Sequence, residues 1–401
     1  TPLYSSAASD VYKRQVLTSM DDANLAELGI DESVEDSVLR LAKLAADGYC
    51  GQARGALPSF TNVNNCAMVT GTPPSQTGIG GNYIIDPETG EEVMTNSSRF
   101  LRNDTILAAA STAGRKVAMV TAKDKLRELL SKGMDGIAVS SEKADEVSAE
   151  VNGIDNVESF AGPKPSIYSG EASLYALRVG VELLAAGRAD FLYLSLTDYM
   201  QHKYAPEAPE SREFYRGIDT EVGRLLDLGS VVGITADHGM NAKFNQAGEP
   251  DVLYLQYLFD EWLGTEQARV ILPITDPYVV HHGALGSFAT VYLADVAKAQ
   301  ELAGRLAEVE GIEAAYTNVE GCMAFDLPND RLGDLIVVST TNKVLGTIPE
   351  RHDLSQLKEP LRSHGGVCDR QVPLVFSQQV EATGALLHNY DLFDLALNHA
   401  S

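Results

Sequence analysis

Three short runs of apolar residues place the strongest constraint on the fold, because each is too continuous for a half-exposed strand. They are KVAMVTA (116–122), DFLYLSLT (190–197) and SVVGITA (230–236). Rich in β-branched and aromatic residues and followed by polar ones, they are typical of parallel strands buried on both faces. Helical stretches separate them, such as SLYALRVGVELLAAG (173–187), which ends at a glycine. We therefore predict an α/β fold with an open, doubly wound sheet flanked by helices.

A different pattern begins near residue 284. Strand, helix and strand signals follow one another in GSFATVYLADVAKAQELAGRLAEVEGIEAAYTN, and DLIVVST adds another strand. We predict a small α+β cap insert over 284–360, interrupting a core formed by 16–283 and 361–401. Residues 1–15 show neither an apolar signal core nor a helix or strand pattern, so we expect a non-native or disordered leader there.

The charge of the chain limits its partners. With 31 basic and 56 acidic side chains, the formal net charge is −25. This disfavours nucleic acid and anionic membrane surfaces, and taken alone it also disfavours small anions. No run of eighteen apolar residues is present, so no transmembrane helix is expected.

Four scattered cysteines without a CxxC pair fit a reducing compartment. We therefore expect a bacterial cytoplasmic protein, provided that no signal peptide precedes the sequence. A homodimer is left open as a quaternary arrangement.

Two of the predicted strands run into an aspartate that is followed by a histidine. DFLYLSLT leads to Asp198, with His202 four residues later, and SVVGITA leads to Asp237 and His238. Sites in open α/β sheets form at the carboxyl ends of strands, and mixed carboxylate and imidazole ligation favours zinc, with iron or manganese as alternatives. His364, in RSHGG, is a third candidate. Each motif alone is more often a surface pair or a turn, but their joint occurrence favours a metal site.

A hydrolytic metal pair also needs a nucleophile. Thr61, in PSFTNVNN, precedes a predicted helix for which Asn62, Asn64 and Asn65 can supply caps. A hydroxyl at a helix N-terminus lies at the positive end of the helix dipole, which favours its ionised form. From spacing alone, however, a purely capping role for Thr61 is favoured.

Several motifs together resemble the phosphonoacetate hydrolases, a branch of the alkaline phosphatase superfamily related to the nucleotide pyrophosphatase/phosphodiesterases. They are PSFTNVNN, VTGTPPS, GIGGN, TAKDKL, TDYMQHKYAPEAPE, ITADHGMNAK, LPITDPYVVHHGALGS and LRSHGG. The metal motifs are shared across the superfamily, whereas TAKDKL and LPITDPYVVHHGALGS point to this branch. The resemblance implies an alkaline-phosphatase-like fold with a mixed sheet.

The resemblance also implies two zinc ions. The two ligand sets would be Asp198, His202 and His364, and Asp237, His238, Thr61 and an aspartate from the first strand. For that aspartate, VLTSMDDANL offers Asp21 and Asp22, and Asp22 matches the spacing better, although Ala23 stands where the branch has glycine. His281 and His282 are expected to support the site rather than to bind metal.

The implied reaction is hydrolysis of the carbon–phosphorus bond of phosphonoacetate, giving acetate and phosphate through a phosphothreonine at Thr61. Asn82 would donate a hydrogen bond to a phosphonate oxygen. Lys123, Lys125 and His202 would bind the carboxylate, where negative charge develops as the bond breaks. Without the resemblance, the two lysines are typical of a basic surface turn.

Two alternatives remain open at this stage. One is a phosphodiesterase or phosphomonoesterase of the same superfamily, and the other is a catalytically impaired homologue with an incomplete metal site. Two zinc ions and two lysines would make the cleft locally positive, so the net charge of −25 does not exclude a small dianionic substrate.

Overall fold

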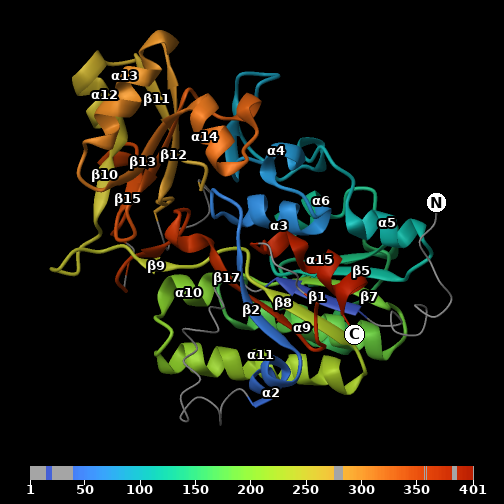
Figure 1. The fold of residues 1–401 in the computed structure, drawn as a ribbon. Coiled ribbons are helices and arrows are strands. Elements are labelled where there is room, and N and C mark those ends of the chain that lie inside the picture. The colour runs from blue at the N-terminus through green and yellow to red at the C-terminus, as the bar shows by residue number, and fades with distance from the viewer. Residues whose placement is uncertain are drawn as a thin grey trace.

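The computed structural model describes residues 15–19, 39–274, 283–355, 357, 359–381 and 386–400. A seven-stranded sheet, ordered β2-β17-β8-β1-β7-β5-β6, forms the larger layer (Figure 1). Its strands are β1 (Gln15–Ser19), β2 (Tyr49–Arg54), β5 (Val117–Thr121), β6 (Gly136–Ser140), β7 (Phe191–Ser195), β8 (Val231–Thr235) and β17 (Gln371–Phe376). β17 runs antiparallel to both of its neighbours, and the other pairings described in this sheet are parallel. The predicted doubly wound, mixed sheet is confirmed.

Helices cover both faces of this sheet because its strands β5, β7 and β8 are buried on both sides. In β5, Val117 and Met119 face one hydrophobic cluster, while Ala118 and Val120 face the other. One face packs against α2 (Leu39–Asp47), α9 (Glu171–Ala185) and α11 (Pro209–Asp227) (Figure 1). The other packs against α3 (Thr61–Thr70), α5 (Ile106–Thr112), α6 (Asp124–Leu130) and α15 (Leu392–Asp394).

A second, four-stranded sheet has the order β11-β12-β14-β13. It comprises β11 (Ala268–Ile271), β12 (Phe288–Leu293), β13 (Ile312–Thr317) and β14 (Leu335–Ser339), together with α12 (Leu255–Leu263), α13 (Ala299–Ala307) and α14 (Asn318–Phe325). β12 and β13 both run antiparallel to β14, which lies between them, so β12, α13 and β13 form a split βαβ unit. β11 pairs with β12 although it precedes residue 284, so this sheet starts before the predicted insert, which is a correction. Its pairing to β12 is long-range and leaves no local sequence signal.

The small sheet lies against the loop that carries Asn82. Arg331 donates hydrogen bonds to the carbonyl oxygens of Gly78 (2.7 Å) and Phe100 (2.5 Å). The backbone N–H of Asn82 donates to the carbonyl oxygen of Pro273 at 2.8 Å. The GIGGN loop (78–82) is therefore held by hydrogen bonds to residues that flank the strands of the small sheet.

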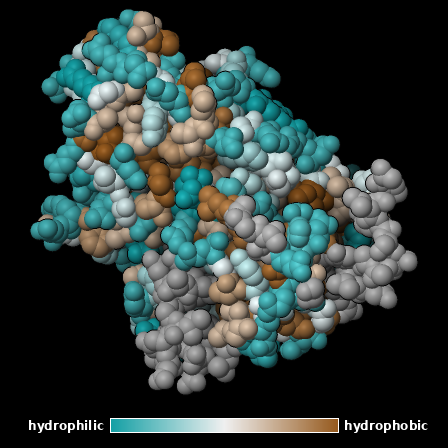
Figure 2. Space-filling model, viewed as in Figure 1, coloured by the Kyte–Doolittle hydropathy of each residue, from teal (hydrophilic) through white to brown (hydrophobic). Residues whose placement is uncertain are grey.

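Shorter elements complete the described chain. They are α4 (Pro74–Thr77), α7 (Ala149–Asn152), α8 (Glu158–Ala161), α10 (Tyr199–Lys203), the pairs β3 (Tyr83–Ile85) with β4 (Glu92–Met94), β9 (Asn241–Ala242) with β16 (Arg362–Ser363) and β10 (Val252–Tyr254) with β15 (Val344–Gly346), and several short 3₁₀ and π turns. Among the described helices, none combines the length and hydropathy needed to cross a membrane. Hydrophilic residues cover much of the face shown in Figure 2, in keeping with the acidic composition.

Some sequence predictions fall on residues that the structure does not describe. These are Asp21 and Asp22, His281 and His282, and residues 1–14 of the expected leader. Gln15, the last residue of that expected leader, begins strand β1, which pairs with β7 and β8.

Candidate active site

The candidate site lies where β7 and β8 end. Asp198 follows β7 and occupies the N-cap position of α10. One helical turn later, His202 places its Nε2 atom 3.0 Å from Asp198 Oδ2, as the four-residue spacing predicts. Both side chains are buried.

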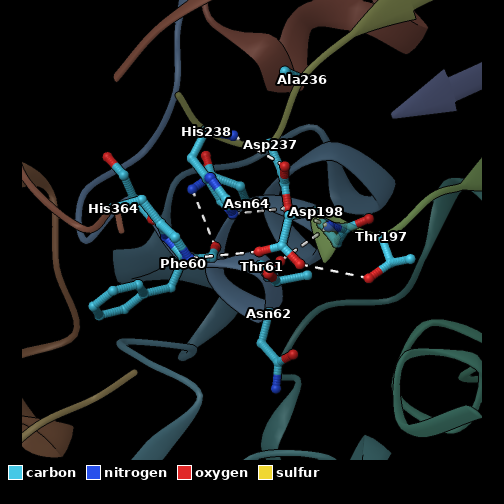
Figure 3. Close-up of polar contacts among 12 residues, drawn as sticks. Phe60, Thr61, Asn62, Asn64, Thr197, Asp198, Ala236, Asp237, His238 and His364 are labelled. Atoms are coloured by element: carbon cyan, nitrogen blue, oxygen red, sulfur yellow. Dashed lines mark hydrogen bonds and ion pairs between the residues drawn. The ribbon is translucent and has the colours of Figure 1, made fainter. Parts of the chain in front are cut away.

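His364 brings a distant part of the chain to the same point. Its ring stacks on that of His238, with centroids 3.7 Å apart and an interplanar angle of 5°. Ligand atoms of Asp198, His238 and His364 all lie within 4.8 Å of one another (Figure 3). Asp198 and His364, which the resemblance assigns to one metal ion, therefore lie in one buried cluster with His238, which it assigns to the other.

His202, which contacts Asp198 of this cluster, is oriented in the same way as His238 and His364. Each Nδ1 atom lies within hydrogen-bonding distance of a backbone carbonyl oxygen, which can only accept. The carbonyls are those of Arg362 for His202 (2.9 Å), Gly239 for His238 (3.1 Å) and Ser59 for His364 (2.7 Å). Nδ1 therefore carries the proton, and in the neutral rings Nε2 presents a lone pair to the site.

These lone pairs face carboxylate oxygens. Besides the His202 contact, His364 Nε2 lies 3.6 Å from Asp198 Oδ2, and His238 Nε2 lies 3.5 Å from Asp237 Oδ2. His238 Nε2 is buried and has no hydrogen-bond partner among the described residues. Such electron-rich atoms can face one another in a buried space only with a proton or a metal ion between them. The residues therefore fit a metal ion, and imidazole with carboxylate is a donor set that zinc accepts.

The ionisation of the cluster agrees with this fit. Burial alone would raise the pKa of Asp198, but the Lys123 ammonium holds it well below its usual value. Burial and the neighbouring His238 and His202 rings lower the pKa of His364 well below its usual value. Asp198 is thus an anion and His364 a neutral base near pH 7, which are the forms that bind metal.

Thr61 is the first residue of α3 and is drawn among the residues of the cluster in Figure 3. The N-cap residue is Phe60, which has no side-chain cap hydrogen bond. Asn62 donates its backbone N–H to Asn82 Oδ1 at 3.1 Å. Because that acceptor must be the amide oxygen, the NH₂ group of Asn82 is the end that can donate to a ligand.

The predicted capping role of the three asparagines is wrong. Asn62, Asn64 and Asn65 lie inside α3 and are buried. Asn64 binds the backbone of Ala56 and Phe60, whereas Asn65 reaches Asp237. The sequence places polar residues near a helix start, but it does not show that this helix start is buried.

The two predicted lysines occupy different positions. Lys123, the N-cap residue of α6, donates from Nζ to Asp198 Oδ1 at 3.4 Å, and about a third of its side chain is exposed. Lys125 lies in the first turn of α6, so the two lysines do not lie on one extended segment.

Asp369 supports the site and is absent from the sequence predictions. Its carboxylate accepts hydrogen bonds from Asn241 Nδ2 (2.6 Å) and from the Gly366 amide (2.8 Å), and its carbonyl accepts from the Gly239 amide (2.7 Å). It thereby joins the loops that carry His238 and His364. A lone acidic residue in a loop has no pattern that would reveal such a role.

Comparison with known proteins identifies the family of this chain. Residues 32–366 match the type I phosphodiesterase/nucleotide pyrophosphatase family. The chain belongs to this family. Its membership confirms the predicted superfamily and the predicted hydrolase class.

Similar solved structures indicate which kind of enzyme within this family the chain resembles. The chain is similar to phosphonoacetate hydrolase from Sinorhizobium meliloti 1021, solved with phosphonoacetate and with phosphonoformate. In both cases the identity is 45%, the TM-score is 0.92, and the match covers 97% of this chain and 96% of the other. The predicted resemblance to phosphonoacetate hydrolases is confirmed. Mouse ectonucleotide pyrophosphatase/phosphodiesterase 5, at 15% identity and TM-score 0.64 over 97% of this chain and 96% of that chain, shares the fold.

Proposed function

We propose that this chain hydrolyses the carbon–phosphorus bond of phosphonoacetate to acetate and phosphate, using zinc and a phosphothreonine intermediate at Thr61. The observation that carries the proposal is the Lys123 ammonium, 3.4 Å from Asp198 at the rim of the buried cluster. A phosphate ester has no carboxylate for that cation to bind, whereas phosphonoacetate does. The 45% identity to an enzyme solved with phosphonoacetate supports the same substrate.

We assign one zinc ion to Asp198, His202 and His364, and a second to Asp237, His238, Thr61 and Asp22. The convergent Nε2 atoms support the histidines in this set, as does the lack of a hydrogen-bond partner for His238 Nε2 within the described part of the chain. When bound, the two ions would supply the positive charge that a dianionic phosphonate needs in a buried site. Iron or manganese in place of zinc remains an alternative.

In the proposed reaction, the Thr61 oxygen attacks phosphorus as the carbon–phosphorus bond breaks, and the electron pair leaves with carbon. That charge spreads onto the carboxylate, where Lys123 stabilises it, with Lys125 and His202 as further proposed contacts. Asn82 donates to a phosphonate oxygen and holds the phosphorus in line with Thr61. Carbon takes up one proton to give acetate, which balances the proton that Thr61 loses on attack. Water then cleaves the phosphothreonine, releasing phosphate and returning a proton to the Thr61 oxygen.

A phosphate-release assay tests the proposal directly. We expect the purified protein to release one phosphate and one acetate per phosphonoacetate, and to lose this activity after dialysis against a chelator. Added zinc should restore it, and metal analysis should find two zinc ions per chain. Zinc-loaded protein that leaves phosphonoacetate intact but hydrolyses a phosphate diester would favour the phosphodiesterase alternative.

The Lys123→Ala variant separates the two substrate classes. We expect kcat/KM for phosphonoacetate to fall by about 10²-fold or more, since a cation near the developing charge is lost. Hydrolysis of a nitrophenyl phosphate ester should change by less than about threefold. Zinc content is measured in parallel because Lys123 also contacts Asp198. Lys143→Ala, which removes a half-exposed lysine paired with Asp124, is the control. Equal losses on both substrates would contradict carboxylate recognition.

The location and assembly of the protein stay proposals as well. The described cysteines are all free thiols, which supports a cytoplasmic location in a bacterium. A homodimer is retained as a proposal, to be checked by the mass of the protein in solution.

A further inference from the structure

Asn65 connects the candidate nucleophile to a candidate metal ligand. It lies on α3 one turn after Thr61 and is completely buried. Its Nδ2 donates to the Thr61 carbonyl at 3.0 Å and to Asp237 Oδ2 at 3.2 Å. Its Oδ1 accepts from the Tyr193 hydroxyl at 2.7 Å and from Ser195 Oγ at 3.1 Å.

The orientation of this amide is determined by its partners. A carbonyl and a carboxylate can only accept, so the NH₂ group must face Thr61 and Asp237. Its oxygen then faces the hydroxyl groups of Tyr193 and Ser195, which both lie on strand β7. All four hydrogen bonds are made inside the protein, where each is stronger than in water and expensive to leave unmade.

Asn65 and a backbone amide each donate to the Asp237 carboxylate. Its Oδ1 accepts from the backbone amide of His238 at 3.0 Å, and its Oδ2 accepts from Asn65. With the Asn65 amide removed, the buried carboxylate loses the donor that orients its Oδ2 atom. The same change frees the first turn of α3, which carries Thr61.

We propose that Asn65 is a positioning residue that holds Asp237 and the first turn of α3 in the arrangement required for zinc binding and for attack by Thr61. The inference rests on the proposed function, because it concerns the same metal site. Asn65 acts through Asp237 and the α3 backbone and does not itself contact the substrate.

Zinc affinity, measured by competition with a chromophoric chelator, tests the proposal without relying on turnover. For Asn65→Ala we expect the zinc dissociation constant to rise by about 10- to 100-fold, the usual effect of removing a residue that orients a metal ligand. At saturating zinc, kcat should fall by at least about tenfold while KM stays within about threefold, since the substrate contacts remain.

The matched control is Asn64→Ala. Asn64 is the adjacent buried asparagine on the same helix, and its partners are Ala56, Phe60 and Asn389 rather than a candidate metal ligand. It should lower the melting temperature but leave the zinc dissociation constant within about threefold of wild type. If both variants lost zinc affinity equally, the role of Asn65 would be structural only and the proposal would be overturned.

Tyr193→Phe is a second variant in case Asn65→Ala does not fold. It removes only the hydroxyl that fixes the amide oxygen and keeps the buried ring, which stacks on Phe393. We expect a smaller rise in the zinc dissociation constant, of about three- to tenfold. Wild-type affinity in both Tyr193→Phe and Asn65→Ala would overturn the inference alone, whereas a wild-type protein that binds no zinc would overturn the proposed function with it.

Discussion

The Thr61→Ala variant is expected to release no measurable phosphate from phosphonoacetate, with kcat reduced by at least about 10³-fold. The reason is that the attacking oxygen disappears, while the cluster of Asp198, His238 and His364 keeps its geometry. Acid-quenched wild-type protein should carry a phosphoryl group on Thr61 during turnover, as peptide mass analysis would detect. Phosphate release within tenfold of wild type would contradict covalent catalysis by Thr61.

Two further variants show that this loss is chemical rather than structural. Thr61→Ser retains a hydroxyl at the start of α3 and should retain measurable activity. Thr70→Ala removes a hydroxyl at the other end of the same helix, where it donates to the Cys66 carbonyl at 2.8 Å, and should keep wild-type kcat. Thr61 is only partly buried and Phe60 provides no side-chain cap, so Thr61→Ala should change the free energy of unfolding by less than about 0.5 kcal/mol.

The Asp198→Asn variant should lose zinc and lose activity by at least about 10²-fold. Asp198 is the anion on which His202, His364 and Lys123 converge. An amide keeps the shape of the side chain but removes the charge, and a neutral amide oxygen is a poor ligand for zinc. Zinc content after gel filtration and phosphate release measure the two effects separately.

Asp219→Asn is the matched control for this change. Asp219 is also a buried carboxylate, but it lies between α11 and α2, where its Oδ1 accepts from the Leu41 amide at 2.7 Å. Its pKa is raised by burial, so the neutral side chain is tolerated better there than at Asp198. Asp219→Asn should keep its zinc and its activity. If Asp198→Asn also kept both, Asp198 would not be a metal ligand.

Much of the large sheet follows from local sequence. So do two features of the candidate site, namely the strand ends before Asp198 and Asp237 and the contact between Asp198 and His202. The runs before Asp198 and Asp237 are apolar without interruption, and such runs form buried parallel strands whatever packs on them. The Asp198–His202 contact follows from one helical turn. The strands β12, β13 and β14 and the helix α13 are predictable for the same reason, because each depends on residues close in the chain.

Other features depend on contacts between distant segments and have no local signature. The pairing of β11 with β12 decides where the small sheet begins. Lys123 reaches Asp198 from the N-cap position of α6, across a sequence separation of 75 residues. Whether an asparagine caps a helix or bonds to a buried site residue depends on what packs beside it. The sequence alone therefore does not distinguish the role of Asn65 from that of Asn64.

The sequence by itself determined the α/β class, the strand ends that carry Asp198 and Asp237, and the motifs that place the chain among the phosphonoacetate hydrolase relatives. Only the tertiary structure decided that His364 stacks on His238, that three imidazoles turn the same nitrogen toward two carboxylates, and that Asn65 ties Thr61 to Asp237. The physical reason is that strands and helical turns are set by neighbouring residues. The orientation of a buried polar side chain is instead set by which donors and acceptors the fold brings to it.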